Sequence, residues 1–115
     1  MQTIDILKTA AAALDDKKGE DIKALKIEDL TILTDYFLLA SGSSSTQVKT
    51  LADEVEDRLA KLGLEPHHIE GKSSTWILLD YGTVVVHVFY KEAREFYDLE
   101  RLWSEGTVIA LETLV

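Results

Sequence analysis

The sequence contains no cysteine, so disulfides, thiolate metal sites and a cysteine nucleophile are all excluded. No apolar run approaches the ~18 residues that a membrane-spanning helix needs. Residues 1–5 also lack the basic start and apolar stretch of a signal peptide. We therefore expect a soluble, cytoplasmic protein that makes no membrane contact.

Positive charge is also scarce, with 12 Lys and Arg against 21 Asp and Glu and a formal net charge of −9. An acidic domain is repelled by phosphate backbones, which argues against direct, extensive nucleic-acid binding. A basic protein partner is favoured instead, because complementary charge speeds encounter. A role in solubility alone is the alternative reading.

The length of 115 residues and the apolar content of 46% predict a single domain, residues 1–115, with one core. Its central pattern is residues 76–89, which we interpret as two strands joined by a tight turn at Gly82. Both strands have nearly continuous apolar runs, which are typical of strands covered on both faces.

Periodicity and turn residues predict the remaining elements. We expect helices at residues 3–16, 46–62 and within 91–103, strands at 21–27, 36–40 and 66–71, and a loop at 72–74. The strand at 66–71 should lie near an edge because it contains Pro66, and the tail 107–115 fits either a helix or a strand. The fold class is therefore α/β (α+β), with a mixed β-sheet of about five strands flanked by helices.

Residues 41–45 precede the helix at 46–62 and are all serine or glycine. This turn could cradle an anion, but a plain helix cap explains it and is the interpretation that we favour. Gly42-Ser43 also resembles the Gly-Ser that opens the active site of nucleotidyltransferases. Those enzymes need two carboxylates one residue apart on a strand to hold metal ions, and no strand here carries such a pair.

The three histidines, His67, His68 and His87, do not have the spacing of a metal site. In the valine-rich strand, a hydrogen-bonded structural role is the usual outcome for His87. A triad of Ser43, His87 and Asp80 has no nucleophile elbow to support it. We therefore predict no metal, no cofactor and no enzymatic activity.

The segment 91–103 alternates charge with large apolar side chains, and a single short helix cannot bury all of them. Aromatic residues and arginine are enriched at protein interfaces, so this segment is our main candidate for a recognition surface. The alternative is that its rings, and that of Trp76, join the core.

Several motifs in order resemble those of the ribosomal silencing factor family, also called the Iojap family. They are Asp35-Tyr36-Phe37, Ser41-Gly42, Gln47-Val48, and residues 68–71, 76–82, 84–89, 94–97 and 99–103. Two positions depart from the pattern near the expected binding surface. Thr83 stands where the family often has Asp, and Thr75 stands where an acidic residue is common.

The resemblance implies a nucleotidyltransferase-like fold without the enzyme's metal carboxylates. It also implies binding to the large ribosomal subunit through ribosomal protein number fourteen, which blocks joining of the small subunit and represses translation. Family members commonly form homodimers. The residues expected to bind the partner are Trp76, Asp80, Tyr81, Arg94, Glu95, Tyr97, Asp98, Leu99, Glu100 and Trp103. The alternative function is a nucleotide-binding or nucleotidyltransferase-like enzyme that uses the Gly42-Ser43 turn.

Overall fold

The computed structural model describes residues 1–71 and 75–115, so the loop expected at 72–74 lies outside the described residues. In chain order, the elements are α1 (Thr3–Asp16), β1 (Glu20–Lys26), β2 (Tyr36–Gly42), α2 (Ser45–Lys61), β3 (His68–Glu70), β4 (Trp76–Asp80), β5 (Val84–Tyr90), α3 (Lys91–Tyr97), α4 (Leu99–Leu102), β6 (Thr107–Ala110) and the 3-10 turn η1 (Leu111–Thr113). The predicted helices and strands are confirmed. No helix in these two described ranges is long and apolar enough to cross a bilayer.

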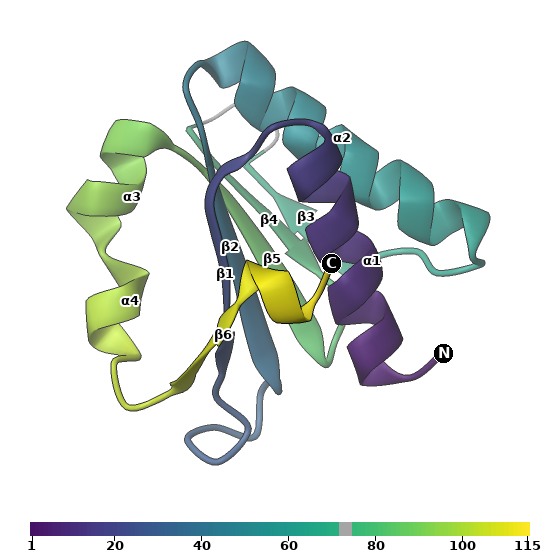
Figure 1. The fold of residues 1–115 in the computed structure, drawn as a ribbon, viewed down its shortest axis with the longest axis vertical. Coiled ribbons are helices and arrows are strands. Elements are labelled where there is room, and N and C mark those ends of the chain that lie inside the picture. Colours follow the sequence, from purple (N-terminus) through teal and green to yellow (C-terminus); the bar gives the residue numbers. More distant parts are fainter. Residues whose placement is uncertain (72–74) are drawn as a thin grey trace.

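The strands form one mixed sheet in the order β3-β4-β5-β2-β1-β6 (Figure 1). β2 and β5 are parallel, and the other neighbouring strands are antiparallel. Parallel neighbours need a long crossover connection, and α2 lies within the one that joins β2 to β5. The described strands number six rather than about five, because residues 107–110 of the tail pair with β1.

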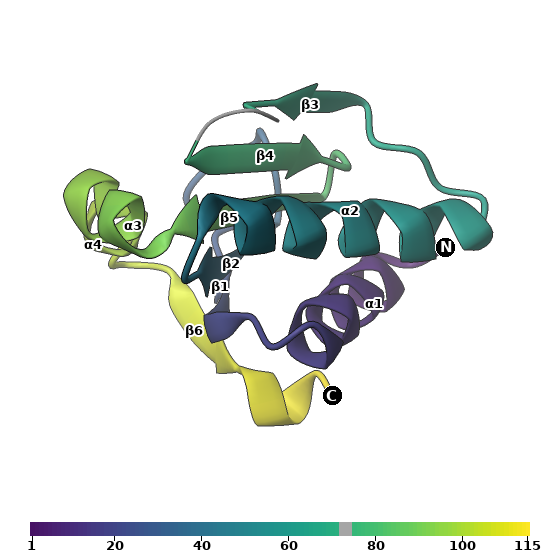
Figure 2. The same cartoon turned by 90° about the horizontal axis from the view of Figure 1, so that it is seen from above.

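Helices α1 and α2 cover one face of the sheet, as Figures 1 and 2 show. The apolar stripe of α2 is fully buried against the sheet at Val48, Leu51, Val55 and Leu59. The strands contribute alternate side chains to the same core, among them Leu38, Val86 and Leu79. This helix-covered layer holds the main hydrophobic core of the protein.

The opposite face of the sheet is covered only in part, by the short helices α3 and α4 (Figure 1). In β5, six of the seven residues are buried, so the predicted coverage on both faces is correct for this strand. In β4, burial alternates, and Leu78 is only half-buried. The prediction of two-sided coverage is therefore wrong for β4, because two short helices are too small to cover the whole face.

The turn between β4 and β5 is tight and contains Gly82, as the sequence predicts. Gly82 has a φ of +86°, which favours glycine. Asp80 accepts a hydrogen bond from the Gly82 N–H at 2.8 Å through its carboxylate. This contact holds the hairpin in register and leaves the Asp80 side chain on the partly covered face.

Candidate partner-binding face

Strand alternation decides which side chains reach the partly covered face. This face receives Phe37 from β2, Trp76, Leu78 and Asp80 from β4, and Val85, His87 and Phe89 from β5. Ala93 and Leu99, from α3 and α4, pack over a small second core of Leu25, Ile27, Leu39 and Phe89. We call the remaining part of the face, around Phe37, Trp76, Leu78, Asp80, Val85 and His87, the open face.

Five rings form a continuous aromatic row across the open face: Tyr97, Trp76, His87, Phe37 and Trp103. Tyr97 and Trp76 have ring centroids 4.7 Å apart, and Trp76 and His87 are 5.8 Å apart. Phe37 then meets His87 edge-on at 4.7 Å and Trp103 edge-on at 5.6 Å. Such contacts fix the rings in place, so the row is a preorganised surface.

Beside the row lies a groove of about 340 Å³, lined by Thr31, Leu33, Thr34, Phe37, Leu78, Asp80, Val85, His87 and Trp103. Leu78 also lines a neighbouring hollow of about 280 Å³ next to Trp76, Tyr97 and Glu70. Leu33, which lines the groove, is 84% exposed, and the adjacent Ile32 is fully exposed. The open face is thus a rigid apolar surface with carboxylates among its lining residues, and such surfaces mark interaction sites.

His87 lies in the groove and is only 3% exposed. Its Nδ1 accepts a hydrogen bond from the Trp76 indole N–H at 3.1 Å, which confirms the predicted hydrogen-bonded histidine. Burial lowers the pKa of His87 from 6.5 to about 4. The imidazole is therefore neutral at physiological pH.

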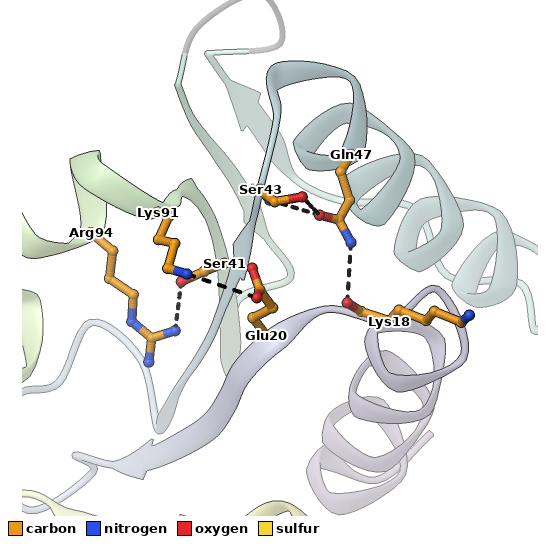
Figure 3. A network of polar contacts seen from close by, with 7 residues as sticks. All are labelled: Lys18, Glu20, Ser41, Ser43, Gln47, Lys91 and Arg94. Atoms are coloured by element: carbon orange, nitrogen blue, oxygen red, sulfur yellow. Dashed lines mark hydrogen bonds and ion pairs between the residues drawn. The ribbon is translucent and has the colours of Figure 1, made fainter.

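Arg94 is held inside the fold and is not a free surface cation; Figure 3 shows its hydrogen bond with Ser41. It is 8% exposed and donates hydrogen bonds to the Ser41 hydroxyl and the Glu100 carboxylate, both at 2.9 Å. Lys23 also pairs with Glu100. Burial alone would raise the pKa of Glu100, but the hydrogen bonds from Arg94 and Lys23 outweigh it and the pKa is lowered. Together these side chains fasten α3 and α4 to the sheet.

Tyr81 does not reach the open face. It is 3% exposed and packs in the main core on the α1–α2 side. Burial raises the pKa of its hydroxyl, and the nearby Glu56 and Glu65 raise it further. Its expected role as a surface anchor is corrected, because it follows Asp80 by one position and so points to the opposite side of the sheet.

The ten residues expected to bind a partner thus separate into groups. Trp76, Asp80, Tyr97 and Trp103 lie on the open face. Leu99 packs over the small second core. Glu95 and Asp98 are exposed around α3, where they line a hollow together with Phe96, Tyr97, Arg101 and Leu102. Sequence reasoning missed Phe37, Leu78, His87 and Leu33, although strand alternation from Trp76 would have identified Leu78.

In the Gly42-Ser43 turn, Ser43 is hydrogen-bonded to a side chain of α2 (Figure 3). The Ser43 N–H and hydroxyl both donate to the Gln47 side-chain oxygen, at 2.7 and 2.9 Å. Ser44 caps α2 by accepting the Gln47 N–H at 3.0 Å, so the cap interpretation is confirmed. Gln47 also donates to the Lys18 carbonyl. Within residues 1–71 and 75–115, no group of three His, Asp or Glu side chains could hold a metal.

Over residues 1–115, the sequence matches the family described as "Ribosomal silencing factor during starvation". It is 43% identical to the ribosomal silencing factor RsfS of Bacillus subtilis over 97% of this chain and 96% of that protein. The chain belongs to the ribosomal silencing factor family. The chain is also similar to the chloroplastic protein Iojap of Zea mays, with 32% identity over 88% of this chain and 44% of that protein.

Solved structures agree with this membership. The crystal structure of a protein from Chromobacterium violaceum superposes with a TM-score of 0.88 at 42% identity, over 90% of this chain and 88% of that one. The two departures from the family pattern lie apart in the structure. Thr75 borders the hollow beside Trp76, whereas the Thr83 carbonyl accepts hydrogen bonds from the Asp35 and Tyr36 N–H groups.

Proposed function

We propose that this ribosomal silencing factor is a non-catalytic protein that binds the large ribosomal subunit through ribosomal protein number fourteen. It thereby blocks joining of the small subunit and represses translation in the cytoplasm. The observation that carries the proposal is the open face, where a fixed aromatic row borders an apolar groove. Family membership supplies the ribosome as the relevant partner.

The charge of the chain supports a basic partner. The net charge is −9, and Asp80 and Glu70 line the two hollows of the open face. A basic ribosomal protein would be steered toward such a surface, and the rings of Trp76, Tyr97 and Trp103 would then anchor it.

To exclude the small subunit, the protein only has to occupy part of the interface between the two subunits. The described protein measures 34 × 33 × 27 Å, so a molecule seated at the subunit interface occupies space that the small subunit needs. This mechanism requires no reaction and no cofactor. It is consistent with the Gly42-Ser43 turn being engaged by Gln47.

The test is co-sedimentation of the protein with isolated large subunits, followed by addition of small subunits. We expect co-sedimentation and a loss of joined ribosomes. Tyr97→Ala should weaken binding, because truncation of an anchoring ring typically costs about 2 kcal/mol, or roughly 30-fold. Leu62→Ala is the matched control. Leu62 is 56% exposed and Tyr97 51%, but Leu62 is the C-cap residue after α2 and does not line the open face.

Each outcome separates a different part of the proposal. Binding without a loss of joining would favour an assembly or adaptor role. No binding at low and moderate salt would refute the partner assignment. We also propose that the protein forms a homodimer, which sedimentation velocity over a range of concentrations tests directly.

A further inference from the structure

A polar pocket of about 430 Å³ lies between β1, β2 and the helices α3 and α4. It shares no lining residue with the groove of the open face, and the proposed function does not use it. Most of its lining residues are charged. The three cations are Lys23, Lys91 and Arg94, and four further lining residues are Asp or Glu. The pocket therefore presents charge of both signs to a ligand.

Two of the cations keep room for a carboxylate. Arg94 is 92% buried and donates from Nε and Nη1 to Glu100 and Ser41. Its Nη2 has no hydrogen-bond partner among the described residues, yet it is not fully buried. Lys91 has a side chain that is 60% exposed, and its Nζ lies 4.0 Å from the Glu20 carboxylate, too far for a hydrogen bond. Figure 3 shows both side chains extending from α3 toward β1 and β2.

The carboxylates of the pocket differ in how they are compensated. Glu100 is paired with both Arg94 and Lys23. Three other carboxylates are exposed and have no ion pair among the described residues, namely Asp21, Glu95 and Asp98. They would repel phosphate or sulfate and attract an ammonium group, so a simple anion does not match this pocket.

Two of the unpaired carboxylates stand on unusual backbone. Asp21 and Asp98 each have a φ of +48°, a left-handed conformation that is uncommon outside glycine. Asp21 also lies where the pairing of β1 with β2 shifts its register, between Glu20 and Lys23. Such irregularities are frequent beside functional sites, where they redirect a side chain. Asparagine tolerates this conformation as well, so the charge can be removed without changing the backbone.

We propose that the polar pocket binds a free α-amino acid with a basic side chain, lysine or arginine. The α-carboxylate of the ligand would lie against Arg94 and Lys91. Its two cationic groups would face the unpaired carboxylates, and its methylene stem would pack on Ile22, which also lines the pocket. This inference does not rest on the proposed function.

The charge balance selects this class of ligand. Three cations and four carboxylates leave the pocket lining with a formal net charge of −1. Lysine or arginine at neutral pH has one carboxylate and two cationic groups, so its net charge is complementary. A diamine lacks the group that Arg94 and Lys91 would bind, and an acidic amino acid would be repelled by the unpaired carboxylates.

The first test is an NMR titration of the whole protein with L-lysine and L-arginine, in about 0.15 M salt to screen non-specific attraction. We expect saturable shifts of the backbone amides of the pocket residues. Cadaverine, which is lysine without its carboxylate, should bind at least roughly tenfold more weakly, and phosphate should cause no such shifts. The absence of saturable shifts with both amino acids up to about 10 mM would overturn the inference. So would equal affinity for cadaverine, or shifts confined to another part of the protein.

The second test removes charge from the pocket. Asp21→Asn combined with Asp98→Asn should weaken binding of L-lysine roughly tenfold while the thermal melt stays close to that of the wild type. Asp15→Asn combined with Asp29→Asn removes two exposed carboxylates outside the pocket and is the matched control. Equal affinity of the pocket variant and this control would contradict the inference.

A third variant does not depend on the two left-handed positions. Lys91→Gln removes an exposed cation, so it should leave the fold intact and weaken L-lysine binding while leaving cadaverine binding unchanged. Unchanged L-lysine binding in this variant would show that the carboxylate is not recognised by Lys91 and would refute the assigned orientation. None of these measurements uses ribosomes. Failure of the amino acids to bind therefore leaves the proposed function standing, and failure to bind large subunits leaves this inference standing.

Discussion

Replacing His87 with phenylalanine should remove much of the acid sensitivity of the fold. In the folded protein, burial lowers the pKa of His87 to about 4, whereas the unfolded chain has the ordinary value of 6.5. The unfolded state therefore binds more protons between these values, so the free energy of unfolding falls as the pH drops through this window. Stability from this group is fully present above pH 6.5.

The magnitude follows from the two pKa values. One pKa unit corresponds to about 1.36 kcal/mol, so the complete effect is about 3 kcal/mol and is reached once the pH falls below the folded-state pKa of about 4. Between pH 7 and pH 5, the wild type should lose about 2 kcal/mol through His87. Glu100, whose pKa is also lowered, adds a loss at still lower pH that both proteins share.

The assay is urea unfolding of the wild type and His87→Phe at pH 5, 6, 7 and 8. At pH 7 the two should have similar stability, because the variant loses the Trp76 hydrogen bond but also removes an unpaired donor. At pH 5 the variant should be the more stable by about 2 kcal/mol. His67→Gln, at an exposed histidine, is the control and should follow the wild type. Parallel pH profiles for His87→Phe and the wild type would refute the reasoning.

Three further perturbations test the site. Trp103→Ala should weaken binding to large subunits roughly 30-fold. It should also lower the free energy of unfolding by about 1–2 kcal/mol, because Trp103 is half-buried against Phe37. Unchanged affinity would show that Trp103 is not part of the interface. Arg94→Ala should lower the free energy of unfolding by about 2–3 kcal/mol, because Ser41 and Glu100 lose their hydrogen bonds from the guanidinium and Glu100 keeps only Lys23. Arg94→Lys should restore little of this loss. ATP with magnesium at millimolar concentration should leave the melting temperature unchanged; a clear increase would revive the nucleotide-binding alternative.

The sequence predicted the helices and strands well because their signals are local. The stripe of α2, its serine cap and the apolar runs of the β4–β5 hairpin each lie within a short window. The tail was ambiguous because residues 107–110 become a strand only through pairing with β1. Such pairing depends on a distant partner that no local pattern reveals.

The candidate site was predicted less completely. Trp76, Tyr97 and Trp103 could be identified from their size and their polar setting, and all three lie on the open face. Tyr81 and Arg94 have the composition of interface residues, yet the fold buries both. Strand alternation from Trp76 would have placed Tyr81 on the opposite face, but no local pattern shows that Ser41 and Glu100 meet Arg94 in the fold.

By itself, the sequence determined the chemistry and the framework of this protein: an acidic, cysteine-free chain whose apolar periodicity builds a mixed sheet with helices on it. Tertiary structure alone decided which face stays open, because coverage depends on where α3 and α4 pack and on how short they are. It also turned His87 from a residue in a valine strand into a buried imidazole that accepts a hydrogen bond from Trp76. Burial and orientation arise from contacts between residues far apart in the chain, so they exist only once the fold is complete.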